Sequence, residues 1–280
     1  MKLPKLIGVI HLSPLVGSPR SHGHHPAEIL QEAGSIAVQE AQALVQAGFD
    51  GLIIENFGDT PFYKTRVPAE TVASMSIIAA AVRDTVDIPV GINVLRNDAG
   101  AALAIAATTG CDFIRVNVLS GVAATDQGLI EGNGAALLRE RDRLHAPVAI
   151  LADVHVKHAQ SLSSSSIALA IEEVGGRGMA DGVIVTGHST GRLVDMTVLR
   201  EASQTARHLN IPLYLGSGAT AESISEIRSL VDGVIVGSTL RKDGMAGAPL
   251  DKKRTLDFAR QFAKLPLKKN EKGKAKRAEK

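Results

Sequence analysis

Two short sequence signatures alternate along the chain, and their number constrains the fold more than any other feature. In the first, an aspartate precedes an apolar run: F-D-G-L-I-I-E-N (49–56), C-D-F-I-R-V-N-V (111–118), A-D-G-V-I-V-T-G (180–187) and V-D-G-V-I-V-G-S (231–238). In the second, a proline opens the run: I-P-V-G-I-N-V-L (88–95), A-P-V-A-I-L-A-D (146–153) and I-P-L-Y-L-G-S-G (211–218), with Pro4 opening a fourth. Proline is tolerated at the first position of a strand, and Asp with Gly suits the turn that leaves a helix. Each signature therefore predicts one β-strand.

The predicted strands fall at about 6–11, 51–56, 90–95, 113–118, 148–156, 182–186, 213–216 and 233–237. Alanine- and leucine-rich helical patterns separate them, for example at 37–48 and 135–144. Eight βα units in one chain predict a single α/β domain, a (β/α)8 TIM barrel over residues 1–265, followed by a basic tail at 266–280. The alternative, a doubly wound open sheet, would usually carry G-x-G-x-x-G after its first strand, and the sequence has none there.

Polar residues near the predicted strand ends share one face. Because both faces of a barrel strand are shielded from bulk water, such residues need a partner or a function. Counting by twos from each aspartate or proline puts them on one side, which we interpret as the barrel interior. His11 breaks this parity, so its direction stays open. The residues on the common face are Glu55, Asn93, Arg115, Asn117, Asp153, His155, Lys157, Thr186, Gly216 and Gly237.

The segment A-D-V-H-V-K (152–157) places three ionisable residues in order of depth. Asp153 should lie deepest, with His155 about 6.6 Å and Lys157 about 13 Å further toward the mouth. His155 is the first acid–base candidate, since its ordinary pKa is near neutrality, and Lys157 is placed to meet a ligand anion. Alternatively, Asp153, Arg115 and His155 form a satisfied network with a structural role. The candidate catalytic set is His155, Asp153, Glu55, Lys157, Arg115 and Asn117.

Two clusters of small residues follow the last two predicted strands, G-S-G-A-T (216–220) and G-S-T-L-R-K-D-G (237–244). Small residues free backbone N–H groups to close on an anion, and a phosphate site after strands 7 and 8 is frequent in this fold. The alternative is a pair of plain turns. The candidate phosphate-binding residues are Gly216, Ser217, Gly218, Gly237 and Ser238, with Thr186 bordering the same pocket.

A divalent metal is a second, weaker expectation, and no cofactor is firmly indicated. His11, Glu55, Asp153 and His155 can supply mixed nitrogen and oxygen ligands, but no H-x-H or other zinc spacing accompanies them. The segment after the second strand holds Phe57, Phe62 and Tyr63, which indicate either a lid or simple packing of a long loop.

The charge of the chain is unevenly distributed. Its net charge is +2, yet the last 13 residues hold seven Lys or Arg and two Glu, so residues 1–267 carry 24 basic and 27 acidic groups. This tail is either a disordered, solubilising end or a contact with an anionic membrane, worth about 1 kcal/mol per basic residue. We expect no nucleic-acid partner, because the body lacks a basic stripe with aromatics. A single cysteine fits a reducing compartment. The sequence contains no run of 18 apolar residues, so it predicts no membrane-spanning helix.

Several of these segments together resemble the BtpA family across about residues 6–245. They include G-V-I-H-L-S-P-L-V-G-S-P, F-D-G-L-I-I-E-N-F-G-D-T-P-F, N-V-L-R-N-D, A-D-V-H-V-K-H-A and V-D-G-V-I-V-G-S-T-L-R-K-D-G. The resemblance implies a phosphate-binding barrel and a role in the biogenesis or stabilisation of photosystem I or another membrane complex. It gives no reaction, and the family also occurs where there is no photosynthesis.

Two hypotheses follow. The protein is either an enzyme on a small phosphorylated metabolite or a non-catalytic assembly scaffold bound peripherally to a membrane. A metabolic lyase, isomerase or hydrolase in a non-photosynthetic cell is a variant of the first. We expect a homo-oligomer in the cytoplasm, either free or on the cytoplasmic face of a thylakoid or other membrane.

Overall fold

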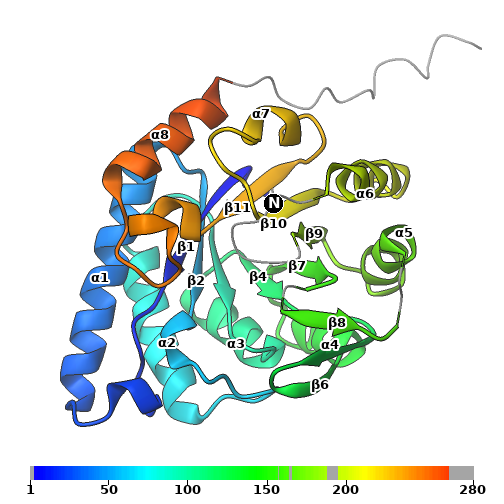
Figure 1. Cartoon of the computed structure of the whole chain (residues 1–280). Helices are drawn as coiled ribbons and strands as arrows, with labels where there is room; N and C mark the ends of the chain where they lie inside the picture. Colours follow the sequence, from blue (N-terminus) through cyan, green and yellow to red (C-terminus); the bar gives the residue numbers. More distant parts are fainter. Residues whose placement is uncertain (1–2, 157, 164–165, 188–194, 265–280) are drawn as a thin grey trace, which may run out of the picture.

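Eight parallel strands close into a barrel in the order β1-β11-β10-β9-β7-β4-β3-β2, which confirms the predicted fold (Figure 1). The computed structural model describes residues 3–156, 158–163, 166–187 and 195–264. All eight strands lie within two residues of their predicted bounds at both ends. The barrel strands are β1 (Leu6–His11), β2 (Gly51–Glu55), β3 (Val90–Asn93), β4 (Phe113–Val116), β7 (Ala149–Val154), β9 (Gly182–Thr186), β10 (Leu213–Ser217) and β11 (Gly233–Val236).

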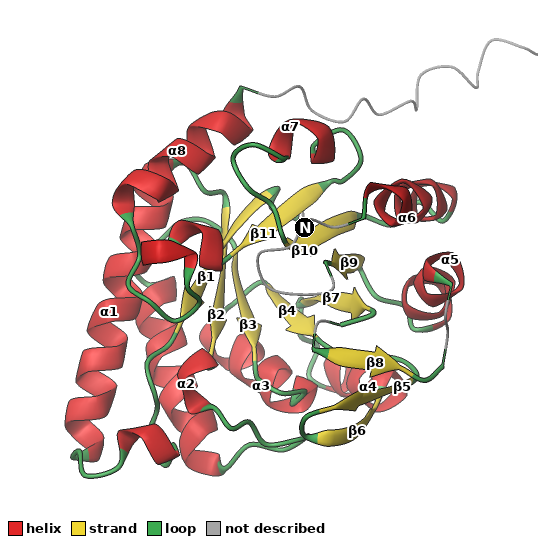
Figure 2. Cartoon of the chain, viewed as in Figure 1, coloured by secondary structure: helices red, strands yellow, loops and turns green. Residues whose placement is uncertain are grey.

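Helices surround the barrel on its outer side (Figure 2). They are α1 (Pro26–Ala47), α2 (Ala69–Arg83), α3 (Ala99–Thr109), α4 (Gly134–Arg143), α5 (Ile167–Ile171), α6 (Met196–His208), α7 (Ile224–Ile227) and α8 (Lys252–Ala263), with a π-helix, η3 (Glu172–Arg177), continuing α5. Ser166, in the serine run before α5, caps that helix by accepting from the Leu169 amide. None of the helices in the described part of the chain combines the length and apolar character that a bilayer crossing requires.

A small antiparallel sheet lies outside the barrel, beside β4 and β7 (Figure 1). Its strands are β5 (Val122–Thr125), β6 (Gly128–Glu131) and β8 (Ala159–Ser161), in the order β6-β5-β8. The sequence pattern predicts no strand at β5 or β6. A tight turn joins them, with Gly128 in the left-handed region (φ 94°), and the short strands carry too few apolar residues to stand out in the sequence.

The barrel interior is packed with alternate residues of its strands. Gly91 and Gly233 make room for the two aromatic rings, because an added Cβ would lie 2.3 Å from the Phe113 ring and 2.4 Å from the Tyr214 ring. Ile7 and Val9 belong to this interior cluster, so the alternation of β1 turns His11 inward as well. The interior cluster consists of Ile7, Val9, Ile53, Phe113, Leu151, Ile184, Tyr214 and Ile235.

The four aspartates of the first signature have a common structural role. Each precedes one strand and accepts a hydrogen bond from a backbone N–H at the start of the barrel strand before it. The pairs are Asp50 with Leu6 (2.6 Å), Asp112 with Val90 (2.9 Å), Asp181 with Ile150 (2.8 Å) and Asp232 with Leu213 (3.0 Å). These aspartate clamps join the strands in pairs at the end of the barrel opposite the candidate site.

A buried ion pair holds the segment that follows β11. This segment forms two short 3-10 turns, η4 (Ser238–Leu240) and η5 (Lys242–Gly244). Between them, Arg241 donates to Glu40 of α1 through both terminal nitrogens, at 2.6 and 2.8 Å, and to the Val9 carbonyl of β1 at 2.9 Å. The segment after β11 is thereby fixed to both β1 and α1.

Candidate functional site

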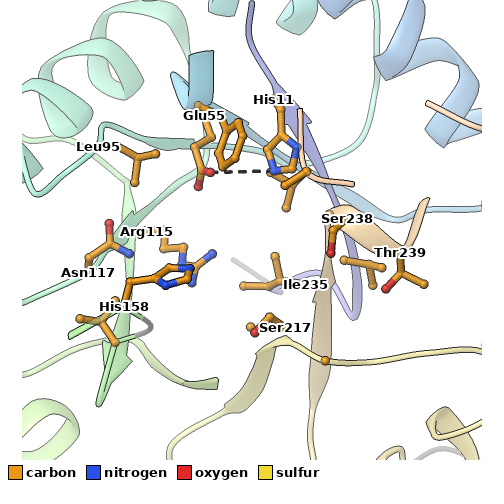
Figure 3. Close-up of a pocket in the computed structure, with 18 of the residues that line it drawn as sticks. His11, Glu55, Leu95, Arg115, Asn117, His158, Ser217, Ile235, Ser238 and Thr239 are labelled. Atoms are coloured by element: carbon orange, nitrogen blue, oxygen red, sulfur yellow. Dashed lines mark ion pairs between the residues drawn. The ribbon is translucent and has the colours of Figure 1, made fainter. Parts of the chain in front are cut away.

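A cavity of about 250 Å³ opens at the carboxyl ends of the barrel strands (Figure 3). This is the end at which barrels of this kind carry their active sites. Its volume is below the roughly 300–1,000 Å³ of pockets for drug-sized ligands, so it suits a small molecule. The strand-end residues that line it include His11, Glu55, Arg115, Asn117, Ser217 and Gly237.

Glu55, the last residue of β2, presents a carboxyl group to this cavity. Its Oε2 accepts a hydrogen bond from Asn93 Nδ2 at 2.6 Å, and its side chain is only 10% exposed. Burial raises the pKa of Glu55, although the Arg115 charge and the Asn93 hydrogen bond oppose the shift. A buried carboxyl group with a raised pKa in a cavity is a candidate for proton transfer to and from a ligand.

His11, at the end of β1, lies next to Glu55 (Figure 3). Its Nε2 is 3.9 Å from Glu55 Oε1, and its Nδ1 accepts a hydrogen bond from the Gly247 amide at 3.2 Å. The imidazole stacks on Phe57 with 4.5 Å between ring centroids. On the side of β11 it touches Gly237, where an added Cβ would lie 3.2 Å from Nε2. The ring is therefore held from three sides, with Nε2 near the carboxyl group.

Arg115, Asn117 and Asp153 form one network under the cavity. Asp153 accepts from Arg115 Nε and Nη2, each at 2.9 Å, and from Asn117 Nδ2 at 2.9 Å. Arg115 and Asp153 therefore form an ion pair. The Asp153 side chain has no exposed surface, and Asp153 is not among the described residues that line the main cavity. The carboxylate orients the two residues above it, both of which line the cavity.

The small-residue segments after β10 and β11 form the opposite wall (Figure 3). Residues 216–219 and 237–239 all line the cavity, and Thr239 Oγ1 donates to the Ala219 carbonyl at 3.0 Å, which ties the two segments together. The Ser217 hydroxyl is buried there and has no hydrogen-bond partner among the described residues. Gly218 has φ 85°, in the left-handed region that glycine favours.

Two of the candidate phosphate-binding residues are placed differently from the rest. At Gly216 an added Cβ would lie 2.5 Å from Ile184 and 3.3 Å from Arg115 Nη2, so the missing side chain makes room for the guanidinium. Thr186 is not among the described residues of the cavity wall. Its hydroxyl donates to the His155 carbonyl at 3.4 Å.

The prediction that β7 continues to residue 156, with His155 on its inward face, is wrong. The strand ends at Val154, and His155 has φ 53°. Because this left-handed backbone breaks the alternation, His155 lines a separate cavity of about 40 Å³ shared with Asp153 and Asn117. His155 is not among the described residues that line the main cavity, and its catalytic role stays a prediction. Lys157 lies outside the described residues.

The four suggested metal ligands do not converge. His11 and Glu55 are neighbours, but Asp153 is engaged by Arg115 and Asn117, and His155 lies in the smaller cavity. Across the residues that the structure describes, no group of three His, Cys, Asp or Glu is arranged to hold a metal ion.

Sequence reasoning missed two basic residues of the cavity wall, Arg96 and His158. Arg96 follows β3 and is 8% exposed. Burial lowers the pKa of its guanidinium, against the nearby Asp153 charge. Its place three residues after the end of a barrel strand was the signal that could have identified it. Of the aromatics after β2, Phe57 and Phe62 line the cavity, whereas Tyr63 is 58% exposed.

Comparison with known proteins places the whole barrel in one family. The family model described as "BtpA family" matches residues 2–264. The chain belongs to the BtpA family. A BtpA relative named "Photosystem I biogenesis protein BtpA", from Synechocystis, is 46% identical over 92% of this chain and 88% of its own length. An uncharacterized BtpA relative from Methanocaldococcus jannaschii is 41% identical over 94% of this chain and 95% of its own length.

Solved structures resemble this BtpA barrel in fold. N-(5'-phosphoribosyl)anthranilate isomerase from Pyrococcus furiosus matches with a TM-score of 0.57 at 15% identity, over 93% of this chain and all of that one. Thiamine phosphate pyrophosphorylase from the same organism matches with a TM-score of 0.56 at 14% identity, over 93% of this chain and 96% of that one. At these identities the likeness supports the barrel fold alone.

Proposed function

We propose that the protein binds a small phosphorylated metabolite at the carboxyl end of its barrel and acts on it by acid–base chemistry. The observation that carries the proposal is the composition of one cavity: two linked small-residue segments form one wall, and a buried carboxyl group with a raised pKa stands in another. This combination suits a ligand with an anionic end and a reactive end.

The wall formed by β10 and β11 provides the groups that a phosphate needs. Backbone N–H groups of small residues can approach phosphate oxygens closely. The buried Ser217 hydroxyl, which has no partner in the described part of the chain, can donate a further hydrogen bond. The Arg115 guanidinium lies beside Gly216 at the same wall, where Asp153 fixes its orientation by a bidentate contact.

The acid–base role falls to Glu55 in this proposal. Its carboxyl group lines the cavity and is held by Asn93, so it is presented to a ligand in one orientation. Arg96 and Asn117 on the neighbouring strand ends offer polar contacts for the body of the ligand. Unlike Asp153, Glu55 is not neutralised by a bidentate guanidinium.

The test compares phosphorylated small molecules with their unphosphorylated counterparts by isothermal titration calorimetry. The matched pair of variants is Ser238→Asp, which puts a negative charge on the candidate anion wall, and Ser229→Asp, which puts one on an exposed residue elsewhere. We expect binding only of phosphorylated compounds, lost in Ser238→Asp and kept in Ser229→Asp. Equal binding of both members of each compound pair, or unchanged binding in Ser238→Asp, would contradict the proposal.

A second candidate function is an assembly factor for a membrane complex. Two observations favour it: the name of the Synechocystis relative and the basic residues 268–280. In this case the protein would act as a peripheral protein on the cytoplasmic face of a membrane. Flotation with anionic phospholipid vesicles, with and without residues 268–280, tests the role of the tail, and equal flotation of both proteins would exclude it.

A further inference from the structure

His11 lies in the cavity wall, where the backbone of the segment after β11 contacts its ring. Its Nδ1 accepts the Gly247 N–H at 3.2 Å, so Nδ1 carries a lone pair and the imidazole proton is on Nε2. Gly247 reaches this position with φ 81°, packed so closely against Phe57 that an added Cβ would lie 3.1 Å from the ring. Backbone geometry therefore selects the tautomer in which neutral His11 presents an N–H at Nε2.

This Nε2–H and the Glu55 carboxyl group stand side by side. The distance from Nε2 to Glu55 Oε1 is 3.9 Å, and the two side chains are 7% and 10% exposed. Both lie at neighbouring strand ends, because His11 of β1 is in register with Glu55 of β2. A ligand in the cavity can thus meet a proton acceptor and a neutral hydrogen-bond donor on the same side (Figure 3).

We infer that Glu55 and His11 form a proton-transfer pair that enolises a phosphorylated α-hydroxy aldehyde or ketone. This deepens the proposed function, on which it rests for the binding of the phosphate group. Removal of a proton from carbon needs a base beside that carbon and a donor at the neighbouring oxygen. A carboxylate with a neutral imidazole is an established combination for this chemistry in a barrel enzyme.

The reaction uses no oxidant and no co-reactant. The Glu55 carboxylate takes the proton from the hydroxyl-bearing carbon, and that C–H electron pair forms the C=C bond. The carbonyl electron pair moves to its oxygen, which accepts the hydrogen bond from His11 Nε2. Glu55 then returns its proton to the neighbouring carbon, while the hydroxyl proton passes through His11 to the other oxygen. The product is an isomer of the substrate.

The activity test is hydrogen exchange in D₂O with the full-length protein, followed by proton NMR of a panel of phosphorylated three- to five-carbon hydroxy aldehydes and ketones. Glu55→Gln should lower the exchange rate by about 10²–10⁴-fold. His11→Ala should lower it by about 10²–10³-fold. His11→Gln keeps an N–H donor and should retain more activity than His11→Ala. Thermal unfolding verifies that each variant is folded.

Two further readouts separate the possible failures. Calorimetric binding of the corresponding phosphorylated polyols, which cannot enolise, reports on the proposed function alone. Polyol binding without exchange by the native protein would overturn the inference and leave that function standing, whereas absence of both would overturn both. Exchange that is unchanged in Glu55→Gln or His11→Ala also overturns the inference. Nitrogen-15 NMR should find the His11 proton on Nε2; a proton on Nδ1 of the neutral ring would refute its geometric basis.

Discussion

Replacement of Asp153 by asparagine should destabilise the barrel strongly while leaving its shape nearly unchanged. The carboxylate has no exposed surface and accepts three hydrogen bonds of 2.9 Å, two of them from Arg115, whose side chain is 10% exposed. Asparagine removes the negative charge. It also replaces one carboxylate oxygen with an NH2 group, which faces the N–H donors of Arg115 and Asn117 and cannot accept from them. Loss of one partner from a buried ion pair costs about 3–5 kcal/mol. At roughly 2–4 °C per kcal/mol, the midpoint of thermal unfolding should fall by roughly 6–20 °C.

The assay is urea unfolding followed by circular dichroism, with thermal unfolding alongside. Glu140→Gln is the matched control, because it removes a carboxylate that pairs with Arg143 on the surface, and no resolvable change is expected. The double variant Asp153→Leu with Arg115→Met should recover much of the lost stability, since it leaves no unpaired charge. If the unfolding free energy of Asp153→Asn lies within about 1 kcal/mol of the native value, the prediction is refuted, because the charge of Asp153 then does not stabilise this network.

Three further predictions concern single positions. Gly91→Ala places a Cβ 2.3 Å from the Phe113 ring and should lower the unfolding free energy by about 1–3 kcal/mol. Gly176→Ala is the control, because an added Cβ there meets no atom of the described residues within 4 Å. Equal urea midpoints of the two variants would contradict the prediction. Because the pKa of Glu55 is raised above 4.5 in the folded protein, its contribution to stability is full below that value and is lost as pH rises through the raised pKa. Glu55→Gln should therefore gain stability relative to the native protein as pH rises from about 4 to about 8, and a constant difference would exclude the shift. Asp232→Ala removes the clamp on the first amide of β10 and should lower the unfolding free energy by about 1 kcal/mol, measured in the same urea assay.

The barrel could be predicted from the sequence because its determinants are local and repeated. Each strand begins beside a proline or an aspartate, and each aspartate accepts a bond from the strand before it. The inward face was also predictable while the backbone remained extended, as for Glu55, Arg115 and Asn117. That residues 216–218 and 237–238 lie at the cavity also followed from their positions at the strand ends, whereas the binding of an anion there stays a prediction.

Prediction failed where the backbone leaves the extended region or where contacts join distant segments. Period-two counting cannot register the left-handed turn at His155, which follows the end of β7 directly. The inward direction of His11 was left open because Pro4 is out of phase with the other prolines. The contact between His11 and Gly247 joins residues 236 positions apart, and no periodicity in the sequence reports such a contact.

The aspartate clamps also divide the barrel into four modules of two strands each. Each clamp stays within one pair of successive barrel strands, β1 with β2, β3 with β4, β7 with β9, and β10 with β11. A new chain start between two pairs, for example at residues 84–88, would cut none of them. β1 and β11 already lie side by side in the barrel, so a circular permutant with linked ends retains the complete set. The barrel thus consists of four two-strand quarters, in which the residues at one end differ while the clamps at the other end stay the same.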